Sequence, residues 1–235
     1  AYYRARNIHC LTCFGLGTVS EHRLVQGDAL LPGQQPYMAN FTDPNKPCPD
    51  CGGGKRSPAE ILARRMHSAG IEDAFKRNTF EAWDHQRSPA MEPAWRQVRA
   101  WADNPVGGLV LIGNVGAGKT HLALAAAQVC VQAGLVVRFG ESRTILRSLK
   151  DATANGGYDE VYEGWAITPN LLVIDDYGAE RGTEFAKDVM EEMVTYRYSR
   201  EKPFIITANW VDLSERISSR FRDASRVTLI HCEGA

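Results

Sequence analysis

The chain has 235 residues, of which 44% are apolar and 23% charged, and its 27 basic residues nearly balance 28 acidic ones. This length and composition fit one large domain or a medium domain with a small one, and they argue against wholesale disorder. The formal net charge of −1 disfavours a histone-like protein that binds nucleic acid by bulk electrostatics, although it is compatible with a local basic surface.

The N-terminal zone, residues 1–56, is rich in Cys, Gly, Pro and Asn and shows little hydrophobic periodicity. The pairs Cys10/Cys13 and Cys48/Cys51 supply four thiolates, enough for one tetrahedral Zn²⁺. Such pairs in a chain without secretory features favour metal ligation over disulfides. Iron in place of zinc stays open because thiolates alone do not select the metal, and two unliganded Cys-x-x-Cys turns are the other alternative.

The same zone is predicted to be a small module that docks a partner, with the metal supplying much of its folding free energy. The long spacer between the two cysteine pairs predicts a hairpin or loop of its own. The first residues lack the apolar core of a signal peptide, and no apolar run reaches the roughly 20 residues of a membrane span. We therefore expect a cytoplasmic protein with no membrane partner.

Residues 57–105 are predicted to form a helical connector. The segment Ser57-Pro58-Ala59-Glu60 combines an N-cap, a proline at the first helical position and a glutamate at the third, so a helix begins there. Gly70 is a stop signal for this helix. A second helix is predicted over Glu92–Ala102, where large apolar residues recur near helical spacing.

Residues 106–235 alternate short apolar runs with helical stretches. The predicted strands are Gly108–Ile112, Leu135–Phe139, Leu171–Asp175, Phe204–Ala208 and Val227–His231. The predicted helices are Thr120–Ala133, Ser142–Lys150 and Glu184–Arg200. Nearly continuous apolar strands separated by helices are typical of a parallel sheet covered on both faces, so we predict an α/β core with a five-stranded parallel sheet.

The segment Gly113–Thr120 matches the pattern G-x-x-x-x-G-K-[ST] at every fixed position, after a predicted strand and before a predicted helix. Backbone N–H groups and the helix N-terminus of such a loop cradle phosphates, the lysine reaches the β- and γ-phosphates, and the hydroxyl binds Mg²⁺. A glycine-rich turn with a chance lysine is the weaker alternative. The predicted ATP-binding residues are Gly113, Asn114, Val115, Gly116, Ala117, Gly118, Lys119, Thr120 and His121.

Polar side chains follow two of the other predicted strands. Asp175 and Asp176 end the apolar run Leu171–Ile174, at the sheet edge where ligands of parallel α/β proteins bind. Asp175 is predicted to hold Mg²⁺, and Asp176 to orient or deprotonate the attacking water. Asn209 follows another strand and is a candidate contact of the γ-phosphate, with an ordinary turn asparagine as the alternative.

Arginines cluster after the fourth predicted strand, between Arg216 and Arg222. One of them could complete the active site of a neighbouring subunit by stabilising transition-state charge. A solvated basic helix is the alternative.

Taken together, these residues resemble the DnaC/DnaI-type replicative helicase loaders, a branch of the AAA+ ATPases with the IstB-type transposition helper ATPases as close relatives. The resemblance covers about residues 65–231. It rests on Ser68–Ile71, Phe75, Asn78–Phe80, Gly113–Ala123, Leu171–Glu180, Thr207–Asn209 and Arg216–Arg220.

The resemblance implies an AAA+ core in which Asp176 or Glu180 is the catalytic base, because Asp176 stands where many AAA+ proteins have glutamate. It also implies that Asn209 is the sensor 1 residue and that Arg220 is the arginine finger, with Arg216 as the fallback. The chain ends just after the fifth predicted strand, so we expect no C-terminal helical lid, in agreement with the loader branch.

The implied function is ATP-dependent loading of a hexameric DnaB-type replicative helicase onto single-stranded DNA during replication initiation. Self-association through ATP-bridged interfaces and slow, partner- or DNA-stimulated ATP hydrolysis would accompany it. The basic face of Arg143, Arg147 and Lys150 would touch single-stranded DNA, with a solvated face as the alternative.

Two other functions stay open. The first is an IstB-type transposase helper ATPase, and the second is a nucleotide-gated helicase adaptor or inhibitor with little turnover. The predicted zinc module favours the loader.

Overall fold

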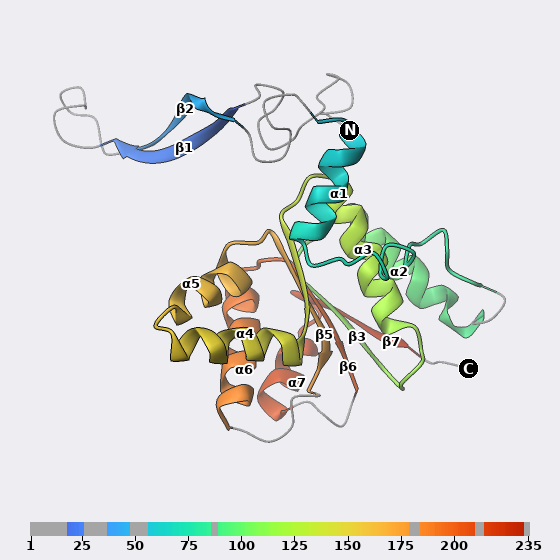
Figure 1. Cartoon of the computed structure of the whole chain (residues 1–235). Helices are drawn as coiled ribbons and strands as arrows, with labels where there is room; N and C mark the ends of the chain where they lie inside the picture. Colours follow the sequence, from blue (N-terminus) through green and yellow to red (C-terminus); the bar gives the residue numbers. More distant parts are fainter. Residues whose placement is uncertain are drawn as a thin grey trace. The chain divides into compact units, whose positions relative to one another are not determined.

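The computed structural model describes residues 18–25, 37–47, 56–85, 89–178, 184–209 and 214–232, with backbone alone for the first two ranges. Figure 1 shows the ribbon. The chain divides into two compact units, Ala1–Arg65 and Met66–Ala235.

The first unit contains a two-stranded antiparallel sheet and the beginning of a helix. Strand β1, Thr18–Val25, pairs with β2, Tyr37–Pro47, so the expected hairpin lies between the two cysteine pairs. Helix α1, Pro58–Ser68, starts with the predicted capping arrangement. The Ser57 backbone N–H donates to Glu60 Oε2 at 2.7 Å, and the Glu60 N–H donates to Ser57 Oγ at 3.3 Å.

The second unit is built on a five-stranded parallel sheet, as the sequence predicted, and its strand order is β4-β5-β6-β3-β7. Its strands are β3 (Gly108–Gly113), β4 (Val137–Glu141), β5 (Leu171–Tyr177), β6 (Phe204–Ala208) and β7 (Val227–Cys232). The order of the strands in space differs from their order in the chain, and it places β3, which leads into the phosphate loop, between β6 and β7.

Strand β4 begins at Val137, two residues later than predicted. Gly134 has a φ of 93°, and the Leu135 N–H donates to the Cys130 carbonyl at 3.0 Å. This is the hydrogen bond of a Schellman cap, so Leu135 closes the preceding helix instead of starting the strand.

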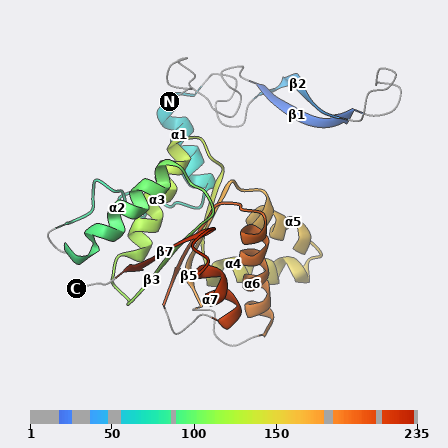
Figure 2. The ribbon, with the colours of Figure 1, turned by 180° about the vertical axis from the view of Figure 1, so that it is seen from behind.

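Helices cover both faces of the sheet (Figures 1 and 2). Helices α2 and α3 lie on one face, and α4, α6 and α7 lie on the other. The helical segments of this unit are η3 (Pro89–Met91), α2 (Glu92–Asp103), α3 (Lys119–Gln132), α4 (Ser142–Ala154), α5 (Tyr158–Tyr162), the π-helical turn η4 (Glu163–Ile167), α6 (Glu184–Ser199) and α7 (Glu215–Phe221). The sequence did not predict α5 or η4. Within the described residues, no helix combines the length and apolar character needed to cross a bilayer.

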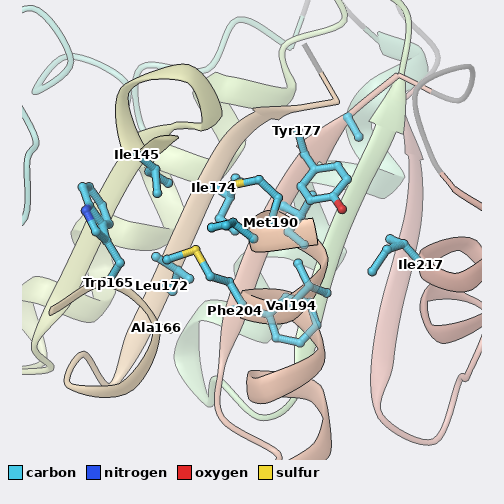
Figure 3. Packing of buried hydrophobic residues seen from close by; sticks show 14 of the residues in the cluster. Ile145, Trp165, Ala166, Leu172, Ile174, Tyr177, Met190, Val194, Phe204 and Ile217 are labelled. Carbon is cyan, nitrogen blue, oxygen red and sulfur yellow. The ribbon is translucent and has the colours of Figure 1, made fainter. Parts of the chain in front are cut away.

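Side chains that alternate along the strands pack against the two helical layers. Figure 3 shows the layer under α4, α6 and α7, where Ile145, Met190, Val194 and Ile217 meet Leu172, Ile174 and Phe204 of the sheet. All of these side chains are buried. Burial on both faces holds the carboxyl ends of the strands rigidly, and those ends carry the predicted site.

Arg197 near the end of α6 is fully buried at 0% exposure. Its guanidinium donates hydrogen bonds to four backbone carbonyls, those of Ala166, Pro169, Asn170 and Pro203, at 2.7–3.2 Å. Burial lowers the pKa of Arg197 to about 10, so the side chain stays charged at neutral pH. It ties α6 to the segments that lead into β5 and β6.

Candidate nucleotide-binding site

The phosphate loop joins β3 to the N-terminus of α3. Gly116 and Gly118 have φ values of 84° and 86°, in the left-handed region that favours glycine. Gly118 is the N-cap residue of α3, which begins at Lys119 and runs for 14 residues. The free N–H groups and the positive end of the helix dipole therefore face the loop, where a phosphate would bind.

Lys119 is held across this loop. Its Nζ donates to the carbonyls of Gly113 and Asn114, both at 2.8 Å, and to Asn209 Oδ1 at 3.3 Å. These acceptors are neutral oxygens, so the bonds fix the ammonium without neutralising its charge. Burial lowers the pKa of Lys119, while Cys232, Asp176 and Asp175 oppose this shift. The contact with Asn209 places the residue that follows β6 beside the loop, and the predicted contact of Asn209 with the γ-phosphate stays a prediction.

Asp175 is buried at 6% exposure near the end of β5 and accepts hydrogen bonds from two hydroxyl groups. Thr120 Oγ1 donates to its two carboxylate oxygens at 2.9 and 3.1 Å, and Thr207 Oγ1 donates to Oδ1 at 2.6 Å. Burial raises the pKa of Asp175, and the two hydroxyl groups oppose that shift. A carboxylate beside a threonine hydroxyl is a set of hard oxygen ligands that suits Mg²⁺.

Asp176 differs from its neighbour because it is exposed and has a φ of 55°. Its N–H donates to Thr207 Oγ1 at 2.9 Å, and its carbonyl accepts from Ser142 Oγ at 2.9 Å. Thr207 is thus a site residue that the sequence reading missed. The available signal was a hydroxyl inside the otherwise apolar strand Phe204–Ala208, between strand residues that are fully buried.

Trp83, in the segment before β3, is a second residue near the loop that was not predicted from the sequence. The Trp83 ring lies on Gly118, where an added Cβ would come within 2.5 Å of the ring. The same ring packs edge-on against His121 at 5.1 Å, and His121 Nε2 donates to the Thr79 carbonyl at 2.8 Å. Within the described residues, the buried Trp83 Nε1 has no hydrogen-bond partner. Trp83 therefore lines the phosphate loop on its His121 side.

Arg220 stands apart from these residues, in the last turn of α7. Its guanidinium donates to the Arg216 carbonyl at 3.1 Å and lies 5.9 Å from the Tyr198 ring centroid. Arg216 Nη1 is 3.8 Å from Glu191 Oε2. These contacts are with α6 and α7 and not with the phosphate loop, so a role for either arginine at a neighbouring subunit stays a prediction.

The basic stripe on α4 is present. Arg143, Arg147 and Lys150 are exposed, while Ile145 and Leu149 of the same helix are fully buried. The stripe therefore faces solvent, and its contact with DNA stays a prediction.

Glu180, Cys10, Cys13, Cys48 and Cys51 lie outside the described residues. In the part of the chain that the structure describes, no group of three or more His, Cys, Asp or Glu residues is arranged to hold a metal ion. The predicted zinc site and the role of Glu180 thus stay predictions.

Comparisons with known proteins agree with this fold. An ATP-binding protein in an insertion sequence of Mycobacterium tuberculosis is 29% identical over 157 residues, covering 66% of this chain and 61% of that protein. The replicative helicase loader DnaC of Escherichia coli is 23% identical over 179 residues, covering 74% of this chain and 73% of that protein.

Two solved structures share the fold at low sequence identity. A crystal structure of the DnaC helicase loader matches with a TM-score of 0.58 and 23% identity, covering 68% of this chain and 99% of that chain. The crystal structure of DnaI matches with a TM-score of 0.56 and 20% identity, covering 68% of this chain and 93% of that chain. The predicted AAA+ P-loop fold is confirmed.

The family match extends over most of the chain, since residues 64–230 match the family described as IstB-like ATP binding protein. This range includes the phosphate loop, both aspartates and Asn209. The resemblance found in the sequence is therefore confirmed, and the chain belongs to the family of IstB-like ATP binding proteins.

Proposed function

We propose that this protein is an ATPase that uses nucleotide binding and hydrolysis to deliver a protein partner to DNA. The observation that carries the proposal is the convergence of Lys119 and Thr120, which follow β3, with Asp175 near the end of β5 and Asn209 after β6. Lys119 donates a hydrogen bond to Asn209 at 3.3 Å, and Thr120 donates to Asp175 at 2.9 and 3.1 Å. Phosphoryl transfer needs a cation, a pair of metal ligands and a polar group near the γ-phosphate, and Lys119, the pair Thr120 and Asp175, and Asn209 would supply them.

Each residue then has a distinct role. The loop N–H groups and Lys119 bind the β- and γ-phosphates. Thr120 and Asp175 would hold Mg²⁺, which when bound neutralises charge on the phosphate oxygens. Asp176, exposed beside the buried Asp175, accepts a proton from the attacking water, with Glu180 as the alternative base. Asn209, fixed to Lys119, orients the γ-phosphate or that water.

The partner that we propose first is a DnaB-type replicative helicase, placed on single-stranded DNA. The similarity to DnaC along 74% of the chain supports it, as does the exposed basic stripe on α4. In this proposal residues 1–56 form the zinc-binding module that docks the helicase, residues 57–105 the connector and residues 106–235 the ATPase core.

A transposase helper is the second candidate. The insertion-sequence relative at 29% identity, of whose length this chain spans 61%, supports this role. A nucleotide-gated adaptor with little turnover is the third candidate, because Asp176 occupies the position where a longer glutamate would reach further toward the water.

The ATPase proposal is tested by the Lys119→Ala variant of the full chain. We expect it to lose binding of a fluorescent ATP analogue, whereas Lys187→Ala, an exposed lysine of α6, keeps wild-type affinity. Equal binding by both variants would refute the assignment of the loop.

The partner is tested by co-purification with ATP, against a hexameric replicative helicase in one arm and an insertion-sequence transposase in the other. Capture of the helicase supports the loader, and capture of the transposase alone supports the helper. Absence of turnover with the captured partner and single-stranded DNA supports the adaptor.

The metal is tested by elemental analysis of the purified protein, where we expect about one zinc per chain, lost in Cys10→Ser. Iron in its place would support an iron–sulfur centre, and a metal-free folded protein would rule out the site.

A further inference from the structure

The end of β5 departs from regular pairing with β6 at the two aspartates. Ile174 is opposite Ile206 and Tyr177 is opposite Ala208, so β5 has one residue more than β6 in this interval. In a regular strand, Asp175 and Asp176 would point to opposite faces of the sheet. The extra residue and the φ of 55° at Asp176 form a β-bulge, which redirects the side chains locally.

Thr207 is the residue of β6 that lies across from this bulge. It is buried at 1% exposure, and its hydroxyl is both a hydrogen-bond donor and an acceptor. The hydroxyl donates to Asp175 Oδ1 at 2.6 Å and accepts from the Asp176 N–H at 2.9 Å. One hydroxyl group therefore fixes the carboxylate of one aspartate and the backbone of the next.

A second hydroxyl holds the other side of the bulge. Ser142, fully buried at the start of α4, donates to the Asp176 carbonyl at 2.9 Å. Ser142 contacts the bulge through Asp176, whereas Thr207 contacts both aspartates. The roles of the Ser142 and Thr207 hydroxyl groups can therefore be tested separately by mutation.

We propose that Thr207 is a positioning residue of the nucleotide site, whose hydroxyl orients Asp175 for Mg²⁺ and holds the bulge that aims Asp176. This inference rests on the proposed ATPase function and deepens it. A hydroxyl that hydrogen-bonds a metal-binding carboxylate sets its orientation, and loss of such a partner costs about 10–100-fold in metal affinity or activity.

The test uses the full chain and measures binding and hydrolysis of ATP across a range of Mg²⁺ concentrations. We expect Thr207→Val, which keeps the shape of the side chain, to raise the Mg²⁺ midpoint by about 10–100-fold and to lower turnover. Thr207→Ser retains the hydroxyl and should restore a midpoint close to wild type. Ser142→Ala should lower turnover and leave the Mg²⁺ midpoint in place.

Thr195→Val is the matched control, because the buried Thr195 hydroxyl has no hydrogen-bond partner among the described residues. Thr195→Val should change neither the Mg²⁺ midpoint nor the turnover. If Thr207 contributed to packing alone, Thr207→Val would have a smaller folded fraction and an unchanged Mg²⁺ midpoint. If Thr207→Val does not fold, Thr207→Ala replaces it. We expect the same rise in the Mg²⁺ midpoint, and alanine places no methyl group against the Asp175 carboxylate.

Two results would overturn the inference, and they are distinguishable. A wild-type Mg²⁺ midpoint in folded Thr207→Val or Thr207→Ala removes the role of Thr207 and leaves the ATPase proposal standing. A wild-type protein that binds no nucleotide with Mg²⁺ overturns the proposed function and this inference with it.

Discussion

Two glycines of the phosphate loop allow backbone strain to be separated from steric contact. Gly116 and Gly118 have nearly the same left-handed φ, 84° and 86°. A Cβ on Gly116 would meet no atom within 4 Å, whereas a Cβ on Gly118 would lie 2.5 and 2.9 Å from two atoms of the Trp83 ring. Alanine at either position has similar strain, and the Trp83 contact adds to it only at Gly118.

The expected destabilisation follows from these contacts. A left-handed conformation costs a non-glycine residue about 1–2 kcal/mol, which is our expectation for Gly116→Ala. Overpacking adds about 1–3 kcal/mol, so Gly118→Ala should lose about 2–5 kcal/mol of unfolding free energy. The lower end applies if the Trp83 ring swings away from the loop.

The assay is urea unfolding of each variant, followed by far-UV circular dichroism and tryptophan fluorescence. In a Trp83→Ala background the clash is gone, so Gly118→Ala should cost no more than Gly116→Ala, a coupling of about 1–3 kcal/mol. Equal costs for the two glycines in the wild-type background, with no coupling to Trp83, would refute the placement of the ring on the loop.

Three further predictions concern residues outside the loop. Arg220→Ala should bind ATP and hydrolyse it poorly, and mixing it with Lys119→Ala should restore part of the turnover; no restoration by mixing would exclude a role in trans. Arg197→Met should lower the unfolding free energy by at least about 3 kcal/mol, since each buried carbonyl left without a donor costs about 1–3 kcal/mol; a near-neutral result in urea unfolding would show that these carbonyls find other donors. Burial raises the pKa of Cys130 to about 12 and of Cys232 to about 11, so peptide mass spectrometry should find both alkylated by iodoacetamide only after unfolding; rapid labelling of the folded protein would contradict their burial.

The sequence predicted the local features well, because their signals are contained in short segments. A phosphate loop needs glycines, a lysine and a threonine at fixed spacing, and Gly113–Thr120 has them all. The apolar composition of Leu171–Ile174, followed by two aspartates, likewise predicts a buried strand that ends in polar side chains. The segment Tyr158–Ile167 was missed because two short helical turns, one of them π-helical, leave no sustained 3.6-residue period.

By itself, then, the sequence determined the parallel α/β class, the phosphate loop and the candidate pair Thr120 and Asp175, which the structure joins by hydrogen bonds. The tertiary structure decided which distant residues complete the site. Thr207 and Trp83 reach it only because β6 lies between β5 and β3 and because residues 79–83 fold back onto the loop. Strand order and a one-residue bulge depend on pairing between segments far apart in the chain, and a local pattern carries no information about such pairing.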